Sequence, residues 1–96
     1  MSFSFFGLFG QTGKFKTVGV TEFAKAVADT SYVVLDVRTP AEHAEGHIPG
    51  THFNIDVLED SYTENALKTI PKDRPVALYC RSGNRSKNAA RILAEN

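Results

Sequence analysis

Two uninterrupted apolar runs constrain the fold more than any other feature of the sequence. Residues 32–37 (YVVLDV) are rich in β-branched side chains, residues 75–80 (PVALYC) repeat the apolar pattern, and neither run alternates with polar residues. This pattern is typical of strands buried on both faces, as in a parallel sheet that helices cover. The segments 21–29 and 86–95 show helical spacing of apolar residues, with Thr21 and Ser86 as candidate N-caps. Strands that alternate with helices predict an α/β domain with a mainly parallel central sheet.

Shorter elements are expected elsewhere in the chain. The sequence predicts a strand at residues 15–20, a helical turn from Pro40 to Gly46, a brief strand at residues 51–55 and a weak helix at residues 64–70.

The amino-terminal segment is apolar but short. Residues 3–9 have no basic residue before them and no small-residue cleavage pattern after them, which makes a poor signal peptide. A bilayer span needs about 20 apolar residues, so no membrane span is expected here. The open interpretations are a flexible arm, a short helix docked on the core and a surface anchor, of which a docked or frayed arm is favoured. We therefore divide the chain into an apolar arm (1–14) and a domain (15–96).

Composition limits the partners. A chain of 96 residues holds one domain. Eleven basic and eleven acidic residues cancel, so the chain has no overall field for nucleic acid or an anionic membrane. Cys80 is the single cysteine and has no internal disulfide partner. A lone thiol fits a reducing compartment, and we expect a cytoplasmic location.

The informative chemistry lies where the second apolar run ends. Cys80 closes that run and is followed by a short loop that leads into a helix. In parallel α/β sheets, sites form beyond the carboxyl ends of strands, and free amides at a helix amino terminus attract anions. Inward-pointing amides of residues 81–86 would form a nest for a thiolate and a bound anion, with Gly83 giving the backbone freedom to curl. A lone cysteine is often an inert core residue, but this context favours a reactive, partly exposed thiol.

A metal site is a weaker interpretation. His43, Glu45, His47 and His52 lie near one another in sequence, and His43 and His47 have helical i, i+4 spacing. Gly46 and the proline that follows interrupt the helix that would place both imidazoles on one face. We therefore expect neither a metal nor another cofactor.

Two separated motifs carry a resemblance to a known family. The loop CRSGNRS (80–86) resembles the active-site loop of rhodanese-like sulfurtransferases. Residues 35–55 (LDVRTPAEHAEGHIPGTHFNI) resemble the family's other signature, with a Glu four residues after L-D-V-R, then G-H-I-P-G and an Asn-Ile pair. The likeness covers residues 15–95. It implies a three-layer α/β domain in which the strand carrying Asp36 lies beside the strand that ends in Cys80.

The resemblance also implies an activity. Cys80 would take a sulfane sulfur from a small anionic donor such as thiosulfate and become a persulfide, and a thiol or thiol-protein acceptor would then remove the sulfur. Backbone amides of the loop would stabilise the charge that develops on the sulfurs. The residues expected to form the substrate-binding loop are Arg81, Ser82, Gly83, Asn84, Arg85 and Ser86.

Three further residues are expected to brace the site rather than react. Asp36 and Arg38 lie at the end of the buried strand, and an ion pair between Arg38 and Glu42 is expected. His47 and Asn54 are interpreted as residues that stabilise turns by hydrogen bonds.

Two other functions remain open. A related cysteine phosphatase would place five residues between its cysteine and arginine, whereas four lie between Cys80 and Arg85. A noncatalytic rhodanese-like binding or regulatory module is the stronger alternative. Inactive members of the family typically lose the loop cysteine, so its presence here favours chemistry.

The carboxyl end departs from the family pattern. Members normally continue with another strand, a Gly-Gly pair and a last helix, whereas this sequence stops at Asn96. By resemblance, the strand that is lacking belongs between the first strand and the strand of Cys80, and its absence would leave backbone groups unpaired. We therefore expect a domain that is incomplete at its carboxyl end. Self-association or a complementing C-terminal segment would complete its sheet.

Overall fold

The centre of the molecule is a sheet, which the computed structural model describes together with its helices over residues 5–9, 15–71, 74–80 and 84–95. In these ranges there are five strands, in the order β2-β1-β5-β3-β4. Their bounds are β1 (Phe5–Phe9), β2 (Phe15–Val18), β3 (Val33–Asp36), β4 (Phe53–Asn54) and β5 (Val76–Cys80). β1 runs antiparallel to β2 and β5, and β3 runs parallel to β4 and β5. All of these strands except β1 thus run in the same direction, which confirms the prediction of a mainly parallel sheet.

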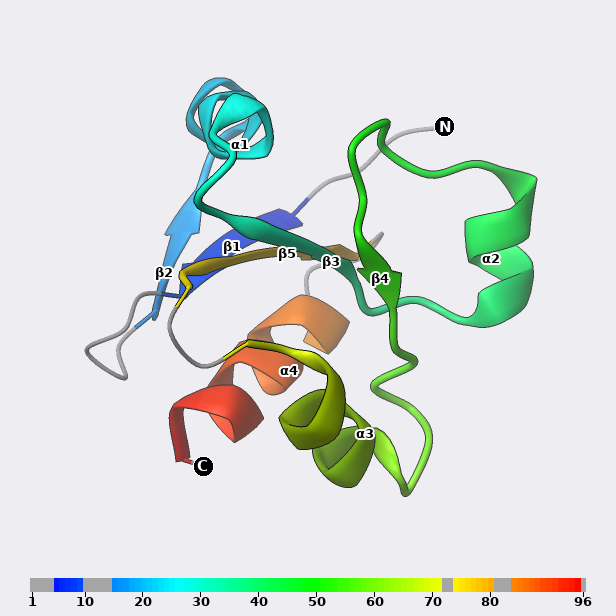
Figure 1. Ribbon diagram of the computed structural model, residues 1–96. Coiled ribbons are helices and arrows are strands. Elements are labelled where there is room, and N and C mark those ends of the chain that lie inside the picture. Colours follow the sequence, from blue (N-terminus) through cyan, green and yellow to red (C-terminus); the bar gives the residue numbers. More distant parts are fainter. Residues whose placement is uncertain (1–4, 10–14, 72–73, 81–83, 96) are drawn as a thin grey trace.

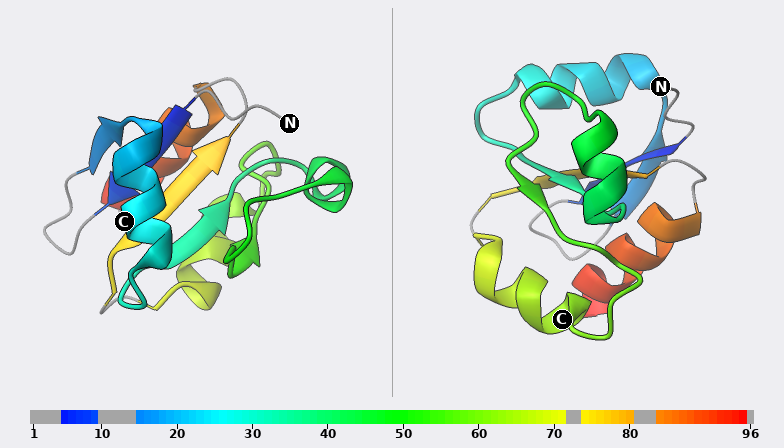
Figure 2. Two further views of the ribbon diagram at one scale, coloured as in Figure 1. Left: turned by 90° about the horizontal axis from the view of Figure 1, so that it is seen from above. Right: turned by 90° about the vertical axis from the view of Figure 1, so that its right-hand side faces the viewer.

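Helices cover both faces of this sheet. In the described ranges they are α1 (Val20–Ala28), α2 (Pro40–Glu45), α3 (Tyr62–Thr69) and α4 (Asn84–Glu95). α1 lies on one face, α3 and α4 lie on the other, and α2 lies beside the β4 edge (Figures 1 and 2). This confirms the three-layer α/β prediction. None of the helices in the described residues is long and apolar enough to cross a membrane.

The two apolar runs form the buried centre of the core. Every residue of β3 and β5 is buried. Leu35 and Leu78 pack on the side of α3 and α4, whereas Val34, Ala77 and Tyr79 pack on the side of α1. Alternate residues of a strand face opposite sides of a sheet, so a strand covered on both sides needs apolar residues throughout. This requirement explains why neither run shows polar alternation.

The helix starts differ from those predicted from the sequence. α1 is capped by Gly19 without a side-chain cap, so the prediction of Thr21 as N-cap is wrong. The main-chain N–H of Phe23 donates to the Gly19 carbonyl at 3.1 Å, which starts the helix two residues earlier. Ser86 is not an N-cap either, because α4 begins at Asn84. α3 begins at Tyr62, whose buried hydroxyl donates to the Ala89 carbonyl of α4, so packing extends that helix.

The amino-terminal segment contributes a strand to the sheet. β1 lies between β2 and β5, with Phe5 opposite Cys80 and Phe9 opposite Val76. The docked arm expected from the sequence therefore contains a strand rather than a short helix. β1 also occupies the position at which unpaired backbone groups were expected. A short apolar segment in extended form satisfies the main-chain groups of both neighbouring strands.

A turn after α2 is fixed against the α1 face. Gly50 has φ +95°, a conformation that favours glycine, and a Cβ there would lie 3.2 Å from Cγ1 of Val27. The Tyr79 hydroxyl accepts a hydrogen bond from the Ile48 N–H at 3.2 Å and lies 2.9 Å from the Thr51 hydroxyl. β5 therefore holds this turn from within the sheet.

Candidate active site

Cys80 lies where β5 ends and α4 begins. The backbone N–H of Ser86 donates to the Cys80 sulfur at 3.2 Å, and the thiol lies 3.2 Å from the Ser86 hydroxyl, to which it donates. Ser86 is in the first turn of α4, so the sulfur accepts one of the amides that a helix leaves without an internal partner. Such amides stabilise negative charge on a sulfur.

The Cys80 side chain is fully buried, so the expectation of a partly exposed thiol is wrong for this structure. Cys80 continues the alternation of β5 on the side of α3 and α4, where it belongs to the same core cluster as Ala89 and Ala90. The small alanines leave room for the sulfur beside α4.

Part of the predicted loop lies outside the described residues. Arg81, Ser82 and Gly83 lie outside the described residues, and Asn84 is described only as the first residue of α4. Their roles as loop residues stay predictions.

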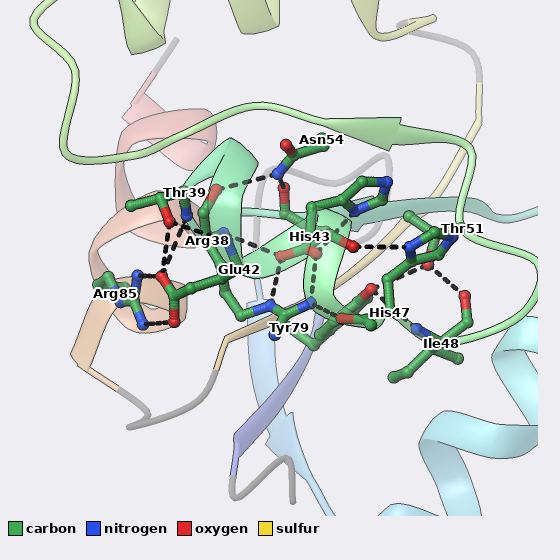
Figure 3. Close-up of polar contacts among 12 residues, drawn as sticks. Arg38, Thr39, Glu42, His43, His47, Ile48, Thr51, Asn54, Tyr79 and Arg85 are labelled. Atoms are coloured by element: carbon green, nitrogen blue, oxygen red, sulfur yellow. Dashed lines mark hydrogen bonds and ion pairs between the residues drawn. The ribbon is translucent and has the colours of Figure 1, made fainter. Parts of the chain in front are cut away.

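Arg85 connects the start of α4 to α2. Its guanidinium binds the Glu42 carboxylate through two hydrogen bonds, of 2.6 and 3.0 Å (Figure 3). Glu42 and Thr39 form a capping box at the start of α2, and its hydrogen bonds fix the orientation of the Glu42 carboxylate. The Arg85 guanidinium, above all, lowers the pKa of Glu42 from 4.5 to about 2, against a smaller opposing effect of burial.

A second ion pair lies completely buried at the end of β3. Arg38 donates through Nε and Nη2 to the two carboxylate oxygens of Asp36, at 2.9 and 2.8 Å, and both side chains have no exposed surface. Burial by itself would raise the pKa of Asp36. The hydrogen bonds from Arg38, together with that from His43, outweigh burial and hold this pKa below its usual value. The predicted pairing of Arg38 with Glu42 is wrong, because each binds another partner.

The burial of each carboxylate explains which arginine it binds. Asp36 is fully buried and therefore needs a bidentate cation, whereas Glu42 is about a quarter exposed and receives Arg85 at the surface. The Arg38 guanidinium also donates to the Gly46 carbonyl at 2.7 Å, which ties the end of α2 to this pair.

The turn-stabilising roles predicted for Asn54 and His47 match the contacts. The Asn54 amide donates to the carbonyls of Asp36 and Arg38 at 3.1 and 2.9 Å, which fixes β4 to the end of β3. His47 Nδ1 lies 3.0 Å from the His43 carbonyl, and the two imidazole rings stack with centroids 3.8 Å apart.

Two contributors were missed by the sequence reasoning. Thr39 forms the capping box that holds Glu42, and the T-x-x-E pattern at residues 39–42 would have revealed it. His43 Nδ1 lies 3.0 Å from the Asp36 carboxylate. No sequence signal indicates that contact, because it depends on how α2 folds back on β3.

Among the residues that the structure describes, no group of three or more His, Cys, Asp or Glu side chains could hold a metal ion. His43 instead faces Asp36, and its ring stacks on His47.

The charges around Cys80 are linked through Arg85. Glu42 above all raises the pKa of Arg85, burial lowers it, and electrostatic interactions with Cys80 and Asp56 raise it further. The guanidinium is therefore within electrostatic reach of the sulfur and keeps its positive charge at all physiological pH values. A helix amide on the sulfur and a fixed cation nearby suit a cysteine that acts as a nucleophile.

The Glu42–Arg85 pair predicts a pH-dependent part of stability. The pKa of Glu42 is lower in the folded state than its ordinary value, so the ionised carboxylate stabilises the fold above pH 4.5, and this contribution is lost as the pH falls towards about 2. We expect Glu42→Gln to lower the free energy of unfolding by about 1–2 kcal/mol at pH 7, after allowance for solvent screening. Urea unfolding of wild type and Glu42→Gln at pH 7 and near pH 2.5 measures this difference in the free energy of unfolding.

The difference between wild type and Glu42→Gln should shrink at the acid pH. The control is Glu64→Gln, which breaks the exposed ion pair with Lys68 and should change stability by less than about 0.5 kcal/mol. A difference that stays constant between the two pH values would contradict the role of the Glu42 charge.

Comparison with known proteins agrees with this geometry. The family model of the rhodanese-like domain matches residues 19–96. The chain is 42% identical to a protein named sulfurtransferase from Allochromatium vinosum, over 75% of this chain and 64% of that protein. It is 35% identical to the putative sulfurtransferase YtwF of Bacillus subtilis, over 74% of this chain and 65% of that protein.

A more distant relative is the thiosulfate sulfurtransferase GlpE of Pseudoalteromonas translucida, 26% identical over 84% of this chain and 73% of that protein. The match spans less than two thirds of the Allochromatium and Bacillus proteins. No solved structure matches the chain. The family model covers most of the sequence, including both motifs and every element from α1 to α4, and the chain therefore belongs to the rhodanese-like domain family.

Proposed function

We propose that this protein is a sulfurtransferase that carries a sulfane sulfur on Cys80. The observation that carries the proposal is the position of the sulfur, 3.2 Å from the backbone N–H of Ser86 in the first turn of α4. Relatives named sulfurtransferases, one of them a thiosulfate sulfurtransferase, support it.

The proposed reaction has two steps. In the first, the Cys80 thiolate attacks the outer sulfur of thiosulfate, a new S–S bond forms, and sulfite leaves with the electrons of the old S–S bond. In the second, an acceptor thiolate attacks that sulfur, the bond to Cys80 breaks, and Cys80 leaves as a thiolate. Atoms and electrons balance without an added oxidant or reductant, and one difficult transfer becomes two easier ones.

The chain's own residues stabilise the charges in these steps. The Ser86 amide would hold negative charge on the Cys80 sulfur, and the fixed Arg85 cation would favour an anionic donor. Arg81 and the remaining loop amides stay proposed contacts. The single cysteine fits a reducing compartment, and the cytoplasm is the proposed location.

A noncatalytic rhodanese-like binding module is the second candidate. The observation that favours it is the complete burial of Cys80, because an attacking donor must reach the sulfur. The two candidates differ in whether Cys80 ever carries sulfur.

Sulfur transfer from thiosulfate to cyanide tests the proposal directly. We expect thiocyanate formation with ping-pong kinetics, and we expect Cys80→Ser to lower the rate by at least about 1,000-fold because it removes the nucleophile. Circular dichroism and thermal melts confirm that both proteins are folded. Thiocyanate formed equally fast by Cys80→Ser, or none formed by folded wild type, would contradict the proposal.

A further inference from the structure

An open cavity of about 370 Å³ lies between the start of α2, the end of β4 and α3. Pro40, Phe53 and Ile55 form apolar parts of its lining, and the carboxylate-bearing residues Asp56 and Glu59 also line it. Its volume is in the range of sites that hold a small ligand or a side chain of a partner.

This cavity lies beside the Cys80 site. Pro40 directly follows Thr39, which orients Glu42, and Glu42 holds Arg85 at the start of α4 (Figure 3). β5, β3 and β4 are successive strands of the sheet, so the backbones of Cys80 and of the end of β4 are separated by about two strand spacings, or about 10 Å. The charge of Asp56 also reaches Arg85, whose pKa rises chiefly through Glu42 and further through Asp56.

The charge of the cavity is opposite to that needed for the sulfur donor. Within the described part of the chain, neither Asp56 nor Glu59 forms an ion pair. Thiosulfate and sulfite are anions, so two carboxylates would repel them. A cation with a methylene stem suits the cavity, because its head can meet the carboxylates while its stem covers the apolar lining.

We propose that this cavity binds a lysine or arginine side chain of a polypeptide thiol acceptor while the acceptor's cysteine removes sulfur from Cys80. The inference rests on the proposed function and adds the class of acceptor to it. It separates the two substrates by charge: the anionic donor meets the amides of α4 and Arg85, and the cationic group of the acceptor meets Asp56 and Glu59.

The cavity carboxylates follow the end of β4, two strand positions from the strand that carries Cys80, and this placement favours a polypeptide over a small aminothiol. An extended peptide advances about 3.3 Å per residue, so a basic side chain two residues from the acceptor cysteine, with its own length added, reaches past two strand spacings, whereas the thiol and amine of cysteamine are only two carbon atoms apart. The side chain of Leu58 is 65% exposed, and its N–H donates to Asp56 at 2.9 Å, so an apolar contact for such a peptide lies next to the carboxylates.

The chemistry is that of the second step. The acceptor thiolate attacks the outer sulfur of the Cys80 persulfide, the new S–S bond forms on the acceptor, and Cys80 leaves as a thiolate. The cavity takes no part in bond making and acts only by holding the acceptor.

The test measures unloading of a protein already loaded with sulfur. Wild type is treated with thiosulfate, its loading is measured by intact mass, and excess donor is removed. Three capped peptides, Cys-Gly-Arg-Gly, Cys-Gly-Gln-Gly and Cys-Gly-Glu-Gly, are then compared as acceptors at low salt. The test variant is Asp56→Asn with Glu59→Gln. The control variant, Glu64→Gln with Glu95→Gln, removes two exposed carboxylates that lie outside the cavity lining.

We expect wild type to be unloaded about five- to tenfold faster by the arginine peptide than by the glutamate peptide, with the glutamine peptide between them and the preference reduced at high salt. The test variant should lose most of this preference and the control variant should keep it. Equal rates for the three peptides, or a preference that the test variant keeps, would overturn the inference alone. Absence of loading on folded wild type would overturn the proposed function and this inference with it.

Discussion

Replacing Arg38 by alanine is expected to remove a large part of the stability of the domain. The Asp36 carboxylate would remain fully buried without its bidentate cation, and the Gly46 carbonyl would lose its donor. Breaking a buried pair by removing one partner costs about 3–5 kcal/mol. A domain of this size has a total stability of about 5–15 kcal/mol. The melting temperature should fall by more than about 15 °C, measured by circular dichroism.

Two variants keep this prediction testable if Arg38→Ala does not fold. Arg38→Lys retains the charge but loses the fork of two hydrogen bonds, and it should fall between wild type and Arg38→Ala. Lys68→Ala breaks an exposed ion pair on α3 and should change stability by less than about 0.5 kcal/mol. A melting temperature of Arg38→Ala within a few degrees of that of Lys68→Ala would show that the buried pair does not hold the end of β3.

Deleting residues 1–9 is expected to destroy cooperative folding. β1 pairs with β2 on one side and with β5 on the other, so its removal exposes two strand edges at once. One of these edges belongs to the strand that carries Cys80. Exposed edges pair with other chains, so the shortened protein should self-associate or melt without a sharp transition. Light scattering and thermal melts of the full chain and the deletion measure this difference.

The control for this prediction is deletion of residues 1–4, which keeps all of β1. It should keep the association state of the full chain and melt cooperatively at a similar temperature. A synthetic peptide of residues 1–10 added to the longer deletion should restore part of the transition. A monomeric 1–9 deletion that melts cooperatively at the temperature of the full chain would show that the sheet is complete without β1.

The strands of the core were predictable because a strand buried on both faces is apolar at successive positions and shows no alternation with polar residues. The runs at residues 32–37 and 75–80 have no polar alternation, and they became β3 and β5. The start of α3 was not predictable in this way, since packing of Tyr62 against α4 decides it. The position of β1 was missed for a related reason: a short apolar segment has no periodicity that separates a strand from a docked helix.

For the candidate site, the sequence predicted which residues take part better than it predicted which residues contact one another. The loop motif pointed to Cys80, and the structure places its sulfur beside the first turn of α4. The partner of Glu42 was misjudged because neighbours in sequence were paired, whereas Arg85 comes from a distant segment. Burial of the thiol was also misjudged, because it depends on how α4 packs over the end of β5.

The proposed function requires that Cys80 carry sulfur between donor and acceptor. The most direct measurement is the intact mass of the purified protein after thiosulfate treatment, with Cys80→Ser in parallel and with cyanide added afterwards. We expect wild type to gain one sulfur atom, cyanide to remove it, and Cys80→Ser to gain none. A well-folded wild type whose mass does not change, or a gain that persists in Cys80→Ser, would contradict the proposed function.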